Sequence, residues 1–194
     1  MSRFFNTSVS LWESMAVMNE LLSRAVTRTA AVVREIREDQ LGLPTPCADF
    51  DVRGLLGHLS RAAGMFDALA RKEEVPPEDG DHTAFESRAA AMVAAWSRPE
   101  AFEGISPTMG MPMTTVFQLG LGDVVIHGWD LARATGQDYG VDEETGEAVA
   151  AFMDRMAPQG RRMGAFREAH AVPEDASPFE RALGLSGRDP GWKP

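Results

Sequence analysis

The chain has 194 residues, of which 44% are hydrophobic, and a net charge of −10. This length and apolar share fit one compact domain with a single core, expected to span residues 1–194. The acidic balance argues against a nucleic-acid partner, because phosphate backbones are bound by concentrated positive charge. No apolar run is long enough for a transmembrane helix, so we expect no membrane partner.

Cysteine content and the N-terminus bear on the compartment. The single cysteine, Cys47, cannot form an internal disulfide, and it excludes a zinc site built on several thiolates. Residues 1–10 lack the basic region and apolar run of a secretory signal. These features predict a cytoplasmic protein.

Residues 8–39 are expected to form the first helix. Apolar side chains recur there at spacings of three and four, at Leu11, Met15, Met18, Leu22, Val26, Val33 and Ile36. Residues 44–51 are predicted to be a loop, because they carry two prolines and two aspartates. Asp49 or Asp51 is placed to cap a second helix over 52–71.

The middle of the chain predicts two further helices. A charged, proline-rich loop at 73–81 precedes a helix over 83–97. Residues 98–113 carry prolines and glycines and are predicted to be a long loop. A helix over 114–135 follows, and Gly136 is expected to end it in left-handed geometry.

A fifth helix is expected to start at its cap, Asp142, and to end before Pro158. The remainder, 158–194, is rich in glycine, proline and arginine, and is predicted to be an irregular tail with a short helix near 178–184. The class is therefore all-α: a four-helix bundle, with the additional helix and the tail packed on its outside.

A candidate metal site lies in the helix over 114–135. Asp123 and His127 are four residues apart, so their side chains share one helix face and can reach one ion. Imidazole and carboxylate are both good ligands for first-row metals. The surrounding residues are apolar, which predicts a buried helix, and a buried carboxylate is costly unless it is paired or ligated.

His58 offers a third ligand from the apolar stripe of the helix over 52–71. Two imidazoles and one carboxylate leave a coordination position for water or substrate, as in catalytic zinc sites. From the residues alone two other readings stay open. His58 is more often a core histidine bonded to a backbone carbonyl, and Asp123 with His127 can be a plain buried ion pair.

Two charged residues near this site are given supporting roles. Asp130 either orients the imidazole of His127, three residues earlier, or forms a salt bridge with Arg53 or Arg133, and we favour the structural role. Arg53 also lies at the start of the helix over 52–71, where the helix dipole favours contact with an anion.

Three segments carry a resemblance to a known family. PTPCADFDVRGLLGHL at 44–59 and DVVIHGWDLARATGQ at 123–137 resemble the DinB-like metal-binding superfamily, in the branch that includes mycothiol-dependent maleylpyruvate isomerase. The ending, DASPFERALGLSGRDPGW at 175–192, is similar to the tail of short, single-domain actinobacterial metal-binding proteins. The resemblance covers nearly the whole chain.

The resemblance implies a bundle that holds one divalent ion through His58, Asp123 and His127. Zinc is the expected ion, although nickel and iron(II) accept the same ligands. Many relatives carry glutamate or histidine where this chain has Asp123, and tryptophan where it has Phe50. The isomerase has an additional C-terminal domain with no counterpart here, so we do not expect its own reaction to carry over.

These expectations favour a metal-dependent enzyme that acts on a small molecule, with a low-molecular-weight thiol such as mycothiol as cosubstrate. An open metal site binds a thiol and lowers its pKa, and the thiolate then adds to or displaces a group on an electrophile. This predicts a transferase or isomerase. The alternatives are a non-catalytic, metal-stabilised binding or stress protein, and a biosynthetic cyclase or isomerase without thiol. The apolar first helix is also compatible with a homodimer.

Overall fold

The computed structural model describes residues 4–75, 77 and 80–194, with side chains from residue 13 onward. Six α-helices and two short 3-10 helices occur in this part of the chain, without any β-strand, which confirms the all-α class. The helices are α1 (Phe4–Arg34), α2 (Val52–Arg71), α3 (Phe85–Trp96), α4 (Met113–Thr135), α5 (Glu143–Arg162) and α6 (Pro178–Leu185). None of the described helices combines the length and the apolar character needed to cross a membrane.

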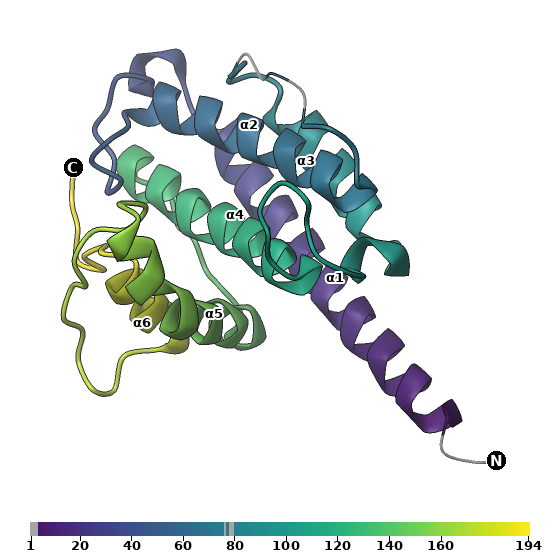
Figure 1. Cartoon of the computed structure of the whole chain (residues 1–194). Coiled ribbons are helices and arrows are strands. Elements are labelled where there is room, and N and C mark those ends of the chain that lie inside the picture. The colour runs from purple at the N-terminus through teal and green to yellow at the C-terminus, as the bar shows by residue number, and fades with distance from the viewer. Residues whose placement is uncertain (1–3, 76, 78–79) are drawn as a thin grey trace.

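The α4 helix lies at the centre of the arrangement (Figure 1). It packs against α1 and α2, while α2 also packs against α3, and these four helices form the expected bundle. On the other side of α4 lies α5, which carries α6 on its own outer face. One apolar cluster contains residues of all six helices, and a single domain over 1–194 stays our prediction.

Close packing of α4 against its neighbours depends on glycines. A side chain at Gly120 would press on the ring of Phe66 from α2, since its Cβ would lie 3.1 Å from a ring carbon. At Gly128 the neighbours are Thr29 of α1 and the hydroxyl of Tyr139, which hydrogen-bond to each other at 2.8 Å. The absence of a side chain at these positions therefore brings α4 close to both α1 and α2.

Several predicted helix ends are confirmed. Asp51 caps α2 by accepting a hydrogen bond from the N–H of Gly54 at 2.7 Å. Asp142 caps α5 in the same way, through the N–H of Thr145 at 3.0 Å. Gly136 ends α4 with a φ of 73°, which is the left-handed geometry that glycine adopts without steric cost.

The first helix ends five residues earlier than predicted, at Arg34 rather than 39. The chain then forms a 3-10 turn, η1 (Glu38–Gln40), in which the buried side chain of Gln40 donates a hydrogen bond to the carbonyl of Thr135 at 3.1 Å. This bond satisfies a free carbonyl at the C-terminal end of α4. A polar contact between distant segments thus overrides the local helical pattern.

The predicted end of the fifth helix before Pro158 is wrong, because α5 continues to Arg162. A proline inside a helix removes the hydrogen bond to the carbonyl four residues earlier, here that of Asp154. Both residues are on the exposed face of α5, where water can take over the lost bond. The loop predicted at 98–113 contains a further short helix, η2 (Pro99–Phe102), that the sequence pattern did not indicate.

We predict that Gly128→Ala destabilises the protein by about 1–3 kcal/mol, because the new methyl group clashes with the hydrogen-bonded Thr29–Tyr139 pair. Gly122→Ala on the same helix is the matched control. Its Cβ would lie 3.5 Å from Met153, an ordinary contact, and alanine is the better helix former. Urea unfolding of both variants is the measurement, and equal stability of the two would contradict the packing described for α4.

Candidate metal centre

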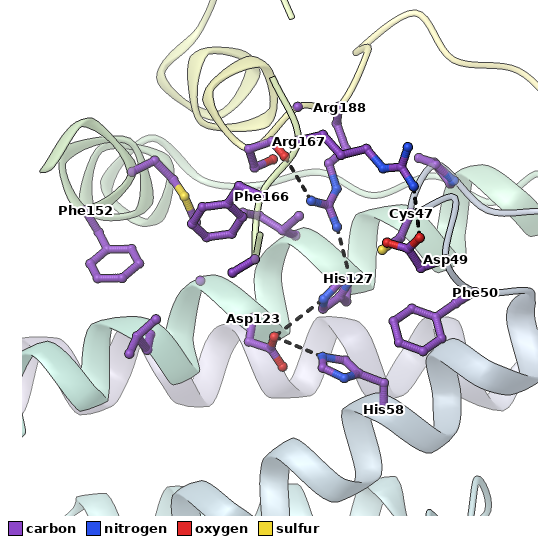
Figure 2. Close-up of a pocket in the computed structure, with 18 residues that line it drawn as sticks. Cys47, Asp49, Phe50, His58, Asp123, His127, Phe152, Phe166, Arg167 and Arg188 are labelled. Carbon is purple, nitrogen blue, oxygen red and sulfur yellow. Dashed lines mark hydrogen bonds and ion pairs between the residues drawn. The ribbon is translucent and has the colours of Figure 1, made fainter. Parts of the chain in front are cut away.

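Three predicted ligands from two helices meet at one point. His58 lies on α2, and Asp123 and His127 lie on α4, where a separation of four residues stacks their side chains on one face. The Oδ1 atom of Asp123 is 3.2 Å from Nε2 of His58 and 3.5 Å from Nε2 of His127 (Figure 2). Ligand atoms about 2.0–2.1 Å from a tetrahedral ion lie roughly 3.3 Å apart, so these spacings suit a shared ion.

The hydrogen bond on the far side of His127 fixes which of its nitrogens is free. Nδ1 of His127 is 2.9 Å from a carboxylate oxygen of Asp130. An ionised carboxylate only accepts hydrogen bonds, so the proton of the ring belongs on Nδ1, and Nε2 of the neutral ring carries a bare lone pair. That lone pair faces the carboxylate of Asp123. Two facing acceptors need a cation between them, either a second proton on the ring or a metal ion.

The second oxygen of Asp123 strengthens this argument. Oδ2 is buried and has no hydrogen-bond partner among the described residues. A buried carboxylate oxygen without a partner carries a desolvation cost that a cation relieves. The donor set of two imidazoles and one carboxylate therefore fits a divalent ion on the structure's own geometry.

Asp123 and His58 shift each other's pKa. Burial alone would raise the pKa of Asp123, but the charges of His127 and His58 outweigh it and hold that pKa below its ordinary value. Burial would lower the pKa of His58, yet the hydrogen bond and charge of Asp123 raise it overall. Protons and a metal ion compete for the same atoms, so metal binding here releases protons.

A buried arginine that the sequence analysis missed supports the far side of the cluster. Arg188, from the segment after α6, donates to Asp130 at 3.0 Å, and Asp130 in turn accepts from His127. The arginine that meets Asp130 is therefore not one of the two proposed from the sequence. Arg133 instead donates to backbone carbonyls of the tail, and Arg53 is exposed and lines a separate hollow.

Asp130 thus forms one of the interactions that the sequence left open, the contact with His127, and its salt bridge is to an arginine that the sequence did not indicate. A carboxylate that accepts the second N–H of a ligating histidine fixes the ring orientation and raises its basicity. The signal for Arg188 was present in the motif DASPFERALGLSGRDPGW, but nothing in the spacing connects it to α4 across 58 positions.

Cys47 offers a competing ligand set with His127 and Asp130, whose donor atoms lie within 4.8 Å of one another. Burial raises the pKa of this thiol, which disfavours the thiolate that a metal needs. Asp130 is moreover already paired with Arg188. The ligand set built on Asp123 is the better candidate. Both imidazoles present Nε2 to its carboxylate, which forms no salt bridge with an arginine among the described residues.

The cluster opens into a cavity of about 300 Å³. One face of α4 forms its floor, with Leu119, Gly122 and Ile126 in line with the two ligands on that helix. The α5 helix, the segments at 165–167 and 186–188, and the loop at 46–50 form the walls (Figure 2). The tail, expected to pack on the outside of the bundle, therefore also helps to build the cavity.

The described residues form a helical bundle with a candidate metal site between two of its helices. The family model for the mycothiol maleylpyruvate isomerase N-terminal domain matches residues 22–105. Two uncharacterized proteins of Mycobacterium tuberculosis, from strains CDC 1551 / Oshkosh and H37Rv, are each 33% identical over 174 residues, which cover 85% of this chain and 94% of theirs. No solved structure matches.

The chain belongs to the mycothiol maleylpyruvate isomerase N-terminal domain family, a DinB-like branch. The matched range contains His58 and ends before Asp123. The pairing of α2 with α4 is therefore information that the structure adds to the family match.

We predict that Zn²⁺ at about a hundred times its dissociation constant stabilises the protein by roughly 3 kcal/mol. His58→Ala should weaken Zn²⁺ binding by about a hundredfold or more, since it removes one of three ligands. His82→Ala is the control, because His82 lines the separate hollow. Calorimetric titration of the chelator-treated protein measures the Zn²⁺ affinity of both variants. Unchanged affinity in the His58 variant would rule out this ligand set.

Proposed function

We propose that the protein is a metal-dependent enzyme that joins a low-molecular-weight thiol, such as mycothiol, to an electrophilic small molecule or isomerises it through such an addition. The observation that carries the proposal is the cavity above Asp123, which leaves room for a cosubstrate beside the three candidate ligands. Zinc is the ion we propose, with nickel and iron(II) as alternatives. The expected homodimer and cytoplasmic location stay predictions.

A divalent ion at this site would supply a Lewis acid that holds a thiol as its nucleophilic thiolate at neutral pH. The charge balance of the protein supports one anionic ligand there. Asp123 offsets only one of the two charges of such an ion, and both imidazoles are neutral when they act as ligands. Arg188 and Asp130 cancel each other. One thiolate would neutralise the remaining charge.

The protein's own residues would orient and protect the reactants. Asp130 and Arg188 hold the ring of His127 in one orientation, with Nε2 toward Asp123. Phe152, Met153 and Phe166 give the cavity an apolar wall, which excludes water from a reactive thiolate. In transfer to a chlorinated aromatic ring, a carbon–sulfur bond forms, the carbon–chlorine bond breaks, chloride leaves with the electron pair, and the thiol proton passes to water.

The test uses purified protein, mycothiol and 1-chloro-2,4-dinitrobenzene, with product formation followed by absorbance and bound metal by elemental analysis. We expect metal-dependent conjugation that His58→Ala lowers by at least about a hundredfold and that His82→Ala leaves unchanged. Metal retained without any thiol chemistry or thiol affinity would contradict the proposal and favour a stabilising metal. Turnover of a small molecule without thiol would instead favour a cyclase or isomerase.

A further inference from the structure

We infer that the second substrate of the cavity is an uncharged, apolar electrophile of aromatic size rather than a carboxylate. This inference rests on the proposed thiol transfer, because it names the molecule that the thiol would attack. It rests on the apolar residues that line the cavity, and on the salt bridges of the two arginines that also line it.

The wall beside the ligands is apolar and comes from two elements. Leu119 and Ile126 of α4 line the cavity together with Phe152 and Met153 of α5, and Phe166 lines it from the segment after α5. Figure 2 labels Phe152 and Phe166. Gly160 leaves room for the ring of Phe166, since any side chain at that position would collide with it. A ligand in this part of the cavity gains free energy by burying apolar surface.

The two arginines at the cavity are already neutralised by the protein. Arg188 pairs with Asp130 and also donates to the carbonyl of Ser186, and only 10% of its side chain is exposed. Arg167, at the rim, pairs with Asp49 at 2.9 Å. Neither arginine offers a carboxylate substrate an unpaired charge.

A carboxylate that entered the apolar part would lose its hydration without a matching partner, which disfavours its binding there. The one unbalanced positive charge we expect at the site belongs to the metal centre, where the thiolate would cancel it. A neutral electrophile therefore fits the space that remains, and a second anion does not.

The decisive experiment compares two molecules of nearly the same shape and different charge. The neutral 1,3-dinitrobenzene and the anionic 3-nitrobenzoate differ by a nitro group in place of a carboxylate, and neither reacts with thiols under mild conditions. Their affinities for the chelator-treated full chain, which carries no metal charge for an anion to bind, are measured by ligand-observed NMR titration. We expect 1,3-dinitrobenzene to bind at least about tenfold tighter. Equal affinity, or tighter binding of 3-nitrobenzoate, overturns the inference.

A variant that stays folded locates the binding. Gly122→Ala adds one methyl group at the apolar wall, in ordinary contact with Met153, so the fold tolerates it. We expect this substitution to weaken the binding of 1,3-dinitrobenzene on the order of tenfold. Gly42→Ala, which has no atom within 4 Å of the added methyl, is the control and should leave binding unchanged. Unchanged binding in the Gly122 variant would place the ligand elsewhere and overturn the inference.

A second variant tests the role of the rim pair. Asp49→Asn leaves Arg167 without its carboxylate partner, and both side chains are exposed enough that the fold should not suffer. The ratio of the affinities for 1,3-dinitrobenzene and 3-nitrobenzoate should then fall by roughly threefold. No change in the preference would contradict the charge balance argued for the rim.

These outcomes separate the inference from the proposed function. The binding comparison needs neither thiol nor turnover, so it can fail while conjugation of 1-chloro-2,4-dinitrobenzene is observed, and the reverse. With active protein, 4-chloro-3-nitrobenzoate is the matched anionic electrophile. Its rate enhancement over the uncatalysed reaction should be at least about tenfold smaller than that of 1-chloro-2,4-dinitrobenzene.

Discussion

The candidate site depends on one carboxylate that is shared between two helices. Asp123 of α4 lies against the imidazoles of His58 on α2 and His127 on α4, and one of its oxygens is buried without a hydrogen-bond partner among the described residues. A bare carboxylate in this position is costly, and a cation relieves the cost. The glycines that let α4 approach its neighbours closely keep these three side chains within reach of one another.

The tail turns this cluster into a site. Arg188 reaches back from the segment after α6 to Asp130, which holds the ring of His127, and neighbouring tail residues close the cavity above the ligands. The same contacts connect the stability of the tail to the orientation of a candidate ligand. The family match over residues 22–105 contains one candidate ligand, His58, whereas Asp123, His127 and Arg188 lie beyond it.

Much of this was readable from the sequence, for identifiable reasons. The spacing of Asp123 and His127, the caps at Asp51 and Asp142, and the left-handed Gly136 are local patterns, and local geometry decides them. The end of α1 and the course of α5 through residue 158 were mispredicted. A long-range hydrogen bond decides the first, and solvent exposure on one helix face permits the second. The partner of Asp130 lies 58 positions away, beyond any spacing rule.

X-ray absorption spectroscopy of the zinc-loaded protein tests the central claim most directly, because it reports the atoms bonded to the ion. We expect nitrogen and oxygen neighbours only, with the multiple-scattering signature of two imidazoles, at about 2.0–2.2 Å. Addition of mycothiol should introduce one sulfur neighbour at about 2.3 Å. A sulfur neighbour before any thiol is added would show that Cys47 is a ligand and would contradict the site built on Asp123.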